Sequence, residues 1–138
     1  MKLLGIDYGR RRIGIAVTDE TGEFVKGLST LDRNKNSEHL HALCSIIAAH
    51  RPQRIVVGLP LDINGDETVM SKEVRQFAVR LGALTGIPLA FVDESLSSVE
   101  AAELIRFRKK KDRRAKGAID RIAACLILTA YQRGLICA

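Results

Sequence analysis

The fold is decided by residues 2–18, which read KLLGIDYGRRRIGIAVT. An apolar run ends in the carboxylate of Asp7, a glycine follows at Gly9, and three arginines precede a second apolar run that begins at Ile13. Large and small apolar residues alternate in that second run, with the period of a β-strand that has two different faces. Magnesium binds carboxylates together with phosphate oxygens, and arginine neutralises phosphate. The stretch therefore predicts two strands joined by a turn, with a magnesium-dependent phosphodiester site beside that turn.

The rest of the chain carries strand and helix patterns. We expect strands at about 2–7, 13–18, 24–31, 55–59 and 89–92. We expect a helix after a cap at Ser37 and a second one with apolar residues from Met70 to Leu84 that ends near Gly86 and Pro88. Two more are expected from Ser97 or Ser98 to about Ile105 and from about 117 to 133. In the last helix, the residues expected to face inward are Ile119, Ile122, Ala123, Leu126 and Ile127.

This order of elements predicts an α/β fold. Three strands that can pair antiparallel, followed by strands that alternate with helices, indicate a five-stranded mixed sheet flanked by helices. Right-handed crossovers place the fourth and fifth strands beyond the first, which gives the strand order 3-2-1-4-5.

Length and composition indicate one globular domain, residues 1–138. With 46% hydrophobic and 28% charged residues, long disorder is not expected. No apolar run approaches the roughly 20 residues of a membrane span, and the strand pattern that starts at Leu3 leaves no room for a signal peptide. The three cysteines lie far apart without metal-ligand spacing, which favours reduced thiols. We therefore expect a cytoplasmic protein without membrane contact, either a monomer or a weak homodimer.

Positive charge is concentrated in two places. The net charge is +6, and residues 106–116 alone contribute +7, so the rest of the chain sums to −1. Such a patch suits a phosphate backbone, which it would bind with little base preference. A solvated loop or a contact with anionic lipid is the alternative. The predicted nucleic-acid-binding residues are Arg106, Arg108, Lys109, Lys110, Lys111, Arg113, Arg114 and Lys116, with a smaller group at Arg10, Arg11 and Arg12.

Acidic residues are expected to meet at one edge of the sheet. Ligands of open α/β sheets bind at the carboxyl ends of the parallel strands, where Asp7 and the pair Asp93-Glu94 fall. Asp120 stands in the first turn of the last helix, where the helix N-terminus favours a carboxylate. We predict Asp7, Glu94 and Asp120 as catalytic residues and, together with Asp93, as ligands for one or two Mg²⁺ or Mn²⁺ ions. Asp19 ends an antiparallel strand at the opposite edge and is excluded.

Each of these acids also has a structural alternative. Asp7 can begin a turn, and Asp93 and Glu94 can cap the helix that follows them. Asp120 can pair with Lys116 or Arg121, or simply complement the helix dipole.

Four segments taken together resemble the YqgF (RuvX-like) family. They are residues 5–16 (GIDYGRRRIGIA), 57–60 (VGLP), 93–97 (DESLS) and 116–124 (KGAIDRIAA). The resemblance covers essentially the whole chain and implies a ribonuclease H-like fold related to the Holliday-junction resolvases. It implies a nuclease that matures the 5′ end of pre-16S rRNA in ribosome biogenesis. It also implies that the family's acids fall on Asp7, on Glu94 with Asp93 adjacent, and on Asp120.

Two residues depart from that family pattern. The family usually has arginine directly after the Asp-Glu pair and threonine soon after, whereas this chain has Ser95 and Ser97. Loss of a guanidinium there weakens a phosphate contact, for which Arg10 to Arg12 or residues 106–116 can compensate.

The leading hypothesis is a Mg²⁺- or Mn²⁺-dependent hydrolase that cleaves phosphodiester bonds in structured RNA. Resolution of branched DNA is the alternative within the same class, because 2′-hydroxyl contacts cannot be read from residue spacing. A nucleic-acid-binding factor without catalysis, in which the acids are structural, is a second class. A third is an ATPase or sugar kinase of the actin-like fold, whose phosphate-binding turn resembles residues 5–17. Those enzymes clasp nucleotide between two such domains, and this chain has length for one.

Overall fold

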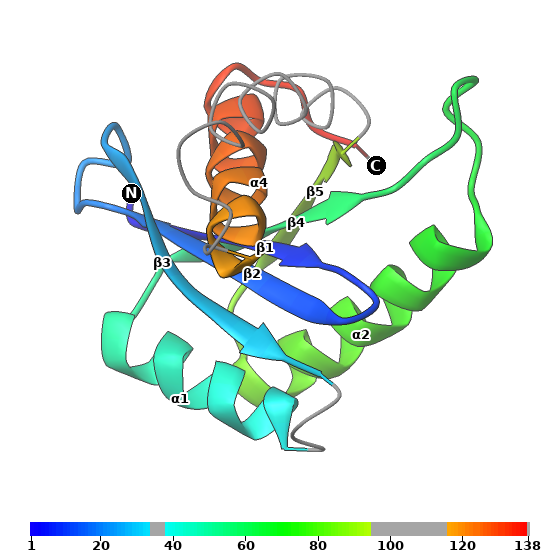
Figure 1. Cartoon of the computed structure of the whole chain (residues 1–138). Helices are drawn as coiled ribbons and strands as arrows, with labels where there is room; N and C mark the ends of the chain where they lie inside the picture. Colours follow the sequence, from blue (N-terminus) through cyan, green and yellow to red (C-terminus); the bar gives the residue numbers. More distant parts are fainter. Residues whose placement is uncertain (34–37, 95–115, 138) are drawn as a thin grey trace.

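The computed structural model describes residues 1–33, 38–94 and 116–137, and Figure 1 shows their arrangement. The five strands form one sheet in the order β3-β2-β1-β4-β5, which confirms the predicted topology. The strands are β1 (Leu3–Tyr8), β2 (Arg12–Thr18), β3 (Val25–Asp32), β4 (Arg54–Leu59) and β5 (Leu89–Asp93). The helices are α1 (His39–His50), α2 (Val69–Thr85) and α4 (Lys116–Gln132).

The strand pairings follow from the connections between the strands. Short turns join β1, β2 and β3, and these strands pair antiparallel. Helical crossovers bring β4 beside β1 and β5 beside β4, and both of these pairs are parallel. The carboxyl ends of β1, β4 and β5 therefore meet at one edge of the sheet.

Different helices cover the two faces of the sheet. Side chains along each strand alternate between these faces, so each strand contributes to both layers of the core. Helices α1 and α2 cover one face, and α4 is the helix among the described residues that covers the other, as Figure 1 shows. The core under α1 and α2 includes Leu4, Ile6, Ile13, Ile15, Leu43, Ile47, Val57, Val74 and Leu81. The core under α4 includes Leu3, Ala16, Val56, Val92, Ala124, Ile127 and Leu128. Burial of each large aliphatic side chain contributes about 1.5–3 kcal/mol, so both layers stabilise the sheet.

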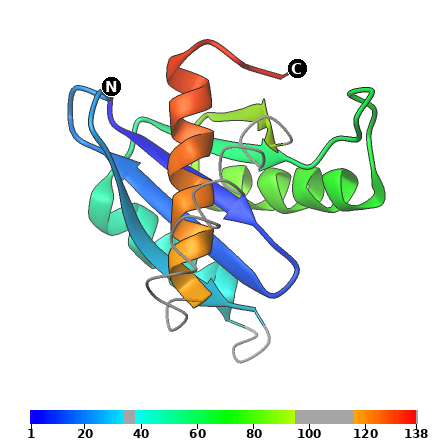
Figure 2. The ribbon, with the colours of Figure 1, turned by 45° about the horizontal axis from the view of Figure 1, so that its top comes forward.

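Glycines let α4 lie directly on the sheet. A Cβ added to Gly5 would lie 2.6 Å from Cγ of Leu128, and one added to Gly58 would lie 2.6 Å from Cδ1 of Ile127. Figure 2 shows α4 running across the strands. A side chain at these glycines would push the helix away from the strands.

The sequence prediction for the buried face of α4 was only partly right. Of the five residues expected to face inward, only Ile127 is buried, and the helix instead buries Ala124, Leu128 and Ala130 beside it. The helix is apolar almost all round between 118 and 130, so the spacing of its apolar residues does not single out one face. The fit against the sheet glycines selects the face.

The other helix predictions had mixed outcomes. Helix α1 begins at His39, and its N-cap Glu38 makes no side-chain capping bond, whereas the predicted cap Ser37 lies outside the described residues. Helix α2 begins with a capping box: the Thr68 side chain accepts from the backbone N–H of Ser71, and the Ser71 side chain accepts from the backbone N–H of Thr68. Leu84, at the end of the predicted apolar stripe, is exposed. The short helix predicted after Ser97 or Ser98 also lies outside the described residues.

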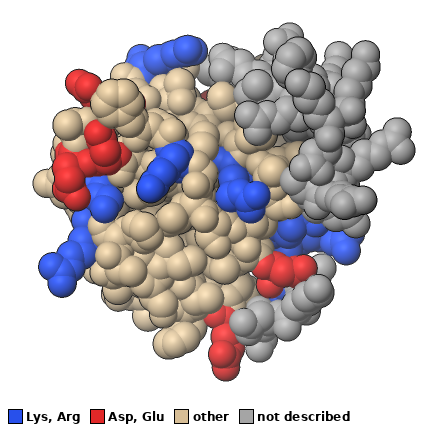
Figure 3. Space-filling model, turned by 60° about the vertical axis from the view of Figure 1, so that its left-hand side comes forward, with Lys and Arg blue, Asp and Glu red and all other residues tan. Residues whose placement is uncertain are grey.

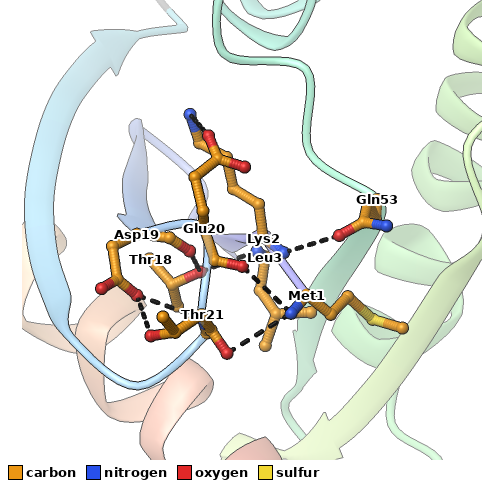
Figure 4. Close-up of polar contacts among 9 residues, drawn as sticks. Met1, Lys2, Leu3, Thr18, Asp19, Glu20, Thr21 and Gln53 are labelled. Atoms are coloured by element: carbon orange, nitrogen blue, oxygen red, sulfur yellow. Dashed lines mark hydrogen bonds and ion pairs between the residues drawn. The ribbon is translucent and has the colours of Figure 1, made fainter.

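The turn after β2 lies far from Asp7, and Figure 4 shows its contacts. Because β2 is antiparallel to β1, its end lies beside the start of β1, where Leu3 N donates to Oγ1 of Thr18 at 2.8 Å. Asp19 folds this turn: its Oδ1 accepts from Oγ1 of Thr21 at 2.7 Å and from Gly22 N at 3.1 Å. Asp19 is therefore a turn residue at the opposite edge, as predicted.

Within the parts of the chain that the structure describes, no helix has both the length and the apolar character needed to cross a bilayer.

Candidate active site

Asp7 lies near the end of β1 on the face that α4 covers, with a glycine beside it on each neighbouring strand. Its partner on β2 is Gly14. On β4, Val57 pairs with Ile6, so Gly58 comes next to Asp7. A Cβ added to Gly14 would collide with the backbone carbonyl of Asp120, and one added to Gly58 would lie 3.4 Å from Cβ of Glu94. The two glycines let the other two acids approach Asp7.

Asp7 and Glu94 form a hydrogen-bonded carboxylate pair. Glu94 follows directly after β5, and both side chains are partly buried. Burial raises the pKa of Glu94 to about 10, helped by its hydrogen bond to Asp7 and by the charges of Asp7 and Asp93. Burial also raises the pKa of Asp7, as does the charge of Asp120, while the hydrogen bond from Glu94 opposes the rise. Both pKa values are raised, so the two carboxyl groups share a proton through their hydrogen bond.

Asp120 stands beside this pair but is bonded elsewhere. Its Oδ2 accepts a hydrogen bond from Nε of Arg12 at 2.8 Å. Arg121, one of the alternative partners considered from sequence, donates instead to Oγ1 of Thr30 at 3.1 Å. Across residues 1–33, 38–94 and 116–137, no three acidic, histidine or cysteine side chains lie close enough together to hold a metal ion. The structure thus joins Asp7 to Glu94 and brings Asp120 near them, paired with arginine.

Asp93 lies on the other face of β5. Strand alternation places it on the face of Phe91, whose ring lies 5.1 Å from the guanidinium carbon of Arg75 on α2. The pKa of the Cys137 thiol is raised mainly by its burial and, to a smaller extent, by the charge of Asp93. Its role as a metal ligand stays a prediction.

The turn after Asp7 is held by a residue that the sequence did not single out, Arg33. Its Nη1 donates to the carbonyl of Gly9 at 2.7 Å, and its guanidinium lies 4.3 Å from the centre of the Tyr8 ring. Its backbone N–H donates to the carbonyl of Arg11 at 2.8 Å. A single arginine at a strand end carries no signal of this role, because Arg33 becomes a neighbour of the turn only through the pairing of β2 with β3.

The predicted phosphate-binding residues are only partly described. Arg10 and Arg11 are exposed on the turn after β1. On the face that Figure 3 shows, some of the described lysine and arginine side chains are surrounded by uncharged ones and others lie beside acidic ones. Outside the described residues lie Arg106, Arg108, Lys109, Lys110, Lys111, Arg113 and Arg114, together with Ser95 and Ser97; for Lys116, only its backbone at the start of α4 is described.

The residues present fit a divalent cation. Asp7 and Glu94 hold their carboxyl groups against each other, and the charge of Asp120 acts on Asp7 as well. Such an arrangement costs stability unless a proton or a cation neutralises it. Carboxylate oxygens are the hard ligands that Mg²⁺ and Mn²⁺ prefer.

Comparison with known proteins identifies one family, whose model matches nearly the whole chain. The family model described as "RuvX: Holliday junction resolvase" matches residues 1–133. A protein of Syntrophus aciditrophicus is 37% identical over 131 residues, which are 95% of this chain and 87% of the relative. A protein of Synechococcus elongatus is 41% identical over 128 residues, 93% of this chain and 86% of the relative. Both relatives carry the name "Putative pre-16S rRNA nuclease".

Solved structures show the same fold. RuvC of T. thermophilus in complex with a Holliday junction substrate superposes with a TM-score of 0.62 at 15% identity, covering 99% of this chain and 98% of that one. The Fowlpox virus resolvase in complex with substrate Holliday junction DNA gives a TM-score of 0.61 at 10% identity, covering 98% and 99%.

Proposed function

Because this chain belongs to the RuvX family and has a ribonuclease H-like fold, we propose that it is a nuclease that processes the 5′ end of pre-16S rRNA. The observation that carries the proposal is the Asp7–Glu94 pair, two carboxyl groups held together at the ligand-binding edge of the sheet. A structural role alone does not explain why two acids share one partly buried place at a cost in stability. A ribosomal RNA precursor as substrate agrees with the predicted cytoplasmic location.

We propose Asp7, Glu94 and Asp120 as the residues that hold Mg²⁺ or Mn²⁺. The bound cation would polarise the scissile phosphate and help to generate the attacking hydroxide. Asp7 sits on a central strand that pairs with β2 on one side and β4 on the other, which fixes the place of its backbone. Glu94 must give up the proton it shares with Asp7 before both groups can act as ligands, so cation binding releases a proton.

The arginines after Asp7 would hold the substrate. Arg10 and Arg11 are exposed on the turn, and Arg33 fixes the backbone of that turn. Guanidinium groups in this place can bind the phosphates that flank the scissile bond. Residues 106–116 would extend the same contact along the RNA backbone.

Cleavage of branched DNA is the second candidate. Two similar structures hold Holliday junctions, but at 15% and 10% identity they support the fold and not the substrate. The relatives at 37% and 41% identity are named for pre-16S rRNA instead. RNA is therefore the substrate that we propose.

The test compares both substrates directly. Labelled RNA spanning the 5′ end of 16S rRNA and a four-way DNA junction are each incubated with the protein, with Mg²⁺, Mn²⁺ or EDTA. We expect cation-dependent cleavage of the RNA, and loss of cleavage with retained RNA binding in Asp7→Asn. Asp19→Asn is the matched control, because Asp19 lies at the opposite edge of the sheet, and it should cleave normally. Cleavage by Asp7→Asn at the wild-type rate would refute the proposed site, and preference for the junction would favour the DNA alternative.

A further inference from the structure

Arg12 and Asp120 form an ion pair inside the proposed active site. Nε of Arg12 donates to Oδ2 of Asp120 at 2.8 Å, and the side chains are 32% and 16% exposed. The contact joins the first residue of β2 to the fifth residue of α4, just beyond the first turn of that helix and 108 positions away in sequence. The bond uses one of the five N–H donors of the guanidinium. The pair therefore sits where water and a substrate can reach it.

The backbone around this pair is held by close packing and hydrogen bonds, which favours a rearrangement of the side chains alone. The carbonyl of Asp120 packs on Gly14, and that of Gly117, one turn earlier, accepts from Oγ1 of Thr30 at 2.7 Å. The carbonyl of Arg12 accepts from Gly9 N at 3.0 Å. A rotation of the Asp120 side chain is therefore the favoured way to bring its oxygens toward Asp7 and Glu94.

Arg12 neutralises the charge of Asp120 and holds its Oδ2, so it competes with a cation for that carboxylate. In the described arrangement its carboxylate is bonded to Arg12, and within the described residues no three ligating side chains are gathered tightly enough for a metal ion. A partly exposed ion pair is held weakly, because water competes for both groups. A divalent cation beside Asp7 and Glu94 offers Asp120 the stronger partner.

We propose that Arg12 is a positioning residue with two alternative partners. Before the cation binds, its guanidinium pairs with Asp120. Once Asp120 binds the cation, the guanidinium binds a substrate phosphate instead. The inference rests on the proposed function and adds a coupling to it. Release of Arg12 by the cation places a guanidinium next to the scissile phosphate, so cation and nucleic acid each strengthen binding of the other. That coupling must be reciprocal.

The first measurement is Mn²⁺ binding by calorimetry, without nucleic acid. Arg12→Gln removes the competitor for Asp120, and we expect it to bind Mn²⁺ about fivefold more tightly than wild type. Arg11→Gln is the matched control, because it removes the same charge from the exposed part of the turn. It should change the affinity much less. A purely structural role for Arg12, in which it holds Asp120 ready for the metal, gives the opposite sign: weaker Mn²⁺ binding in Arg12→Gln.

The second measurement is RNA binding by fluorescence anisotropy, with Ca²⁺ or EDTA, using an oligonucleotide from the 5′ region of pre-16S rRNA. Ca²⁺ also takes oxygen ligands. In wild type we expect Ca²⁺ to tighten RNA binding about fivefold. This gain should vanish in Arg12→Gln, whereas Arg11→Gln should weaken binding equally with and without Ca²⁺. Arg12→Lys keeps the charge but lacks the Nε donor, and it should show an intermediate gain.

The outcomes separate the two proposals. Wild-type protein that binds no divalent cation overturns the proposed metal site and the coupling with it. Cation binding that is equal or weaker in Arg12→Gln than in Arg11→Gln overturns the role of Arg12 and leaves the metal site standing. Circular dichroism and thermal unfolding establish that each variant is folded. If Arg12→Gln does not fold, Arg12→Lys decides: a Ca²⁺ gain equal to that of wild type overturns the proposal.

Discussion

The Cα of Gly14 lies so close to the backbone carbonyl of Asp120 that no side chain fits between them. Gly14 is also the partner of Asp7 on the neighbouring strand. One missing side chain therefore sets the distance between a central strand and the helix that carries the third acid of the proposed site. Helix α4 can bring Asp120 to Asp7 because the sheet has no side chain in the way at this point.

Gly14→Ala should separate the helix from the sheet. The added methyl group must displace the carbonyl of Asp120, and overpacking of this kind costs about 1–3 kcal/mol of unfolding free energy. Urea unfolding measures this loss, and calorimetry should show weaker Mn²⁺ binding because Asp120 moves away from Asp7. Val79→Ala, at an exposed site on α2, should change stability by less than about 0.5 kcal/mol. Unchanged stability in Gly14→Ala would contradict the close packing described here.

Asp7→Asn should lose activity and keep or gain stability. The amide cannot replace a carboxylate as a ligand, so we expect cleavage to fall by at least about 100-fold. The same change removes a charge that burial and Asp120 both disfavour, so the cation-free protein should unfold at an equal or higher urea concentration. A clear loss of stability would instead indicate that Asp7 is a structural residue of the turn.

The stability of the cation-free protein should fall as the pH rises. Glu94 has a pKa of about 10 in the folded chain, against 4.5 when unfolded, so the folded state keeps a proton that the unfolded state releases. Its stabilising effect is complete below the lower value and is lost progressively between the two, by up to about 1.4 kcal/mol per pH unit. Urea unfolding in EDTA at about pH 6 and about pH 8 measures the slope. Glu94→Gln should flatten it, and saturating Mg²⁺ should do the same.

Neutralising Lys109, Lys110 and Lys111 should weaken nucleic-acid binding without changing its preference among sequences. For every lysine that binds a phosphate, its neutralisation should lower the slope of log affinity against log salt by about 1. Anisotropy titrations at several salt concentrations, with two unrelated RNA sequences, measure both effects. If affinity and salt dependence stay at wild-type values, residues 106–116 are not part of the substrate-binding surface.

The sequence alone determined the sheet and the place of the first acid. The alternation in 13–18 and the crossovers through helices fix the order 3-2-1-4-5, because these signals are local and the handedness of crossovers is general. The strand bounds differ from those predicted by at most one residue at either end. The same reasoning put Asp7 and Glu94 at one edge, since parallel strands end together.

The tertiary structure decided everything that depends on how α4 sits on the sheet. Apolar residues surround that helix, so its pattern could not choose between faces, and the choice follows from contact with Gly5, Gly14 and Gly58. The same docking decides that Asp120 meets Arg12, a residue 108 positions away, rather than its helix neighbour Arg121. Local sequence sets which residues end a strand or begin a helix. The pairing of charges across the interior depends on ångström-scale packing between segments, which no spacing along the chain encodes.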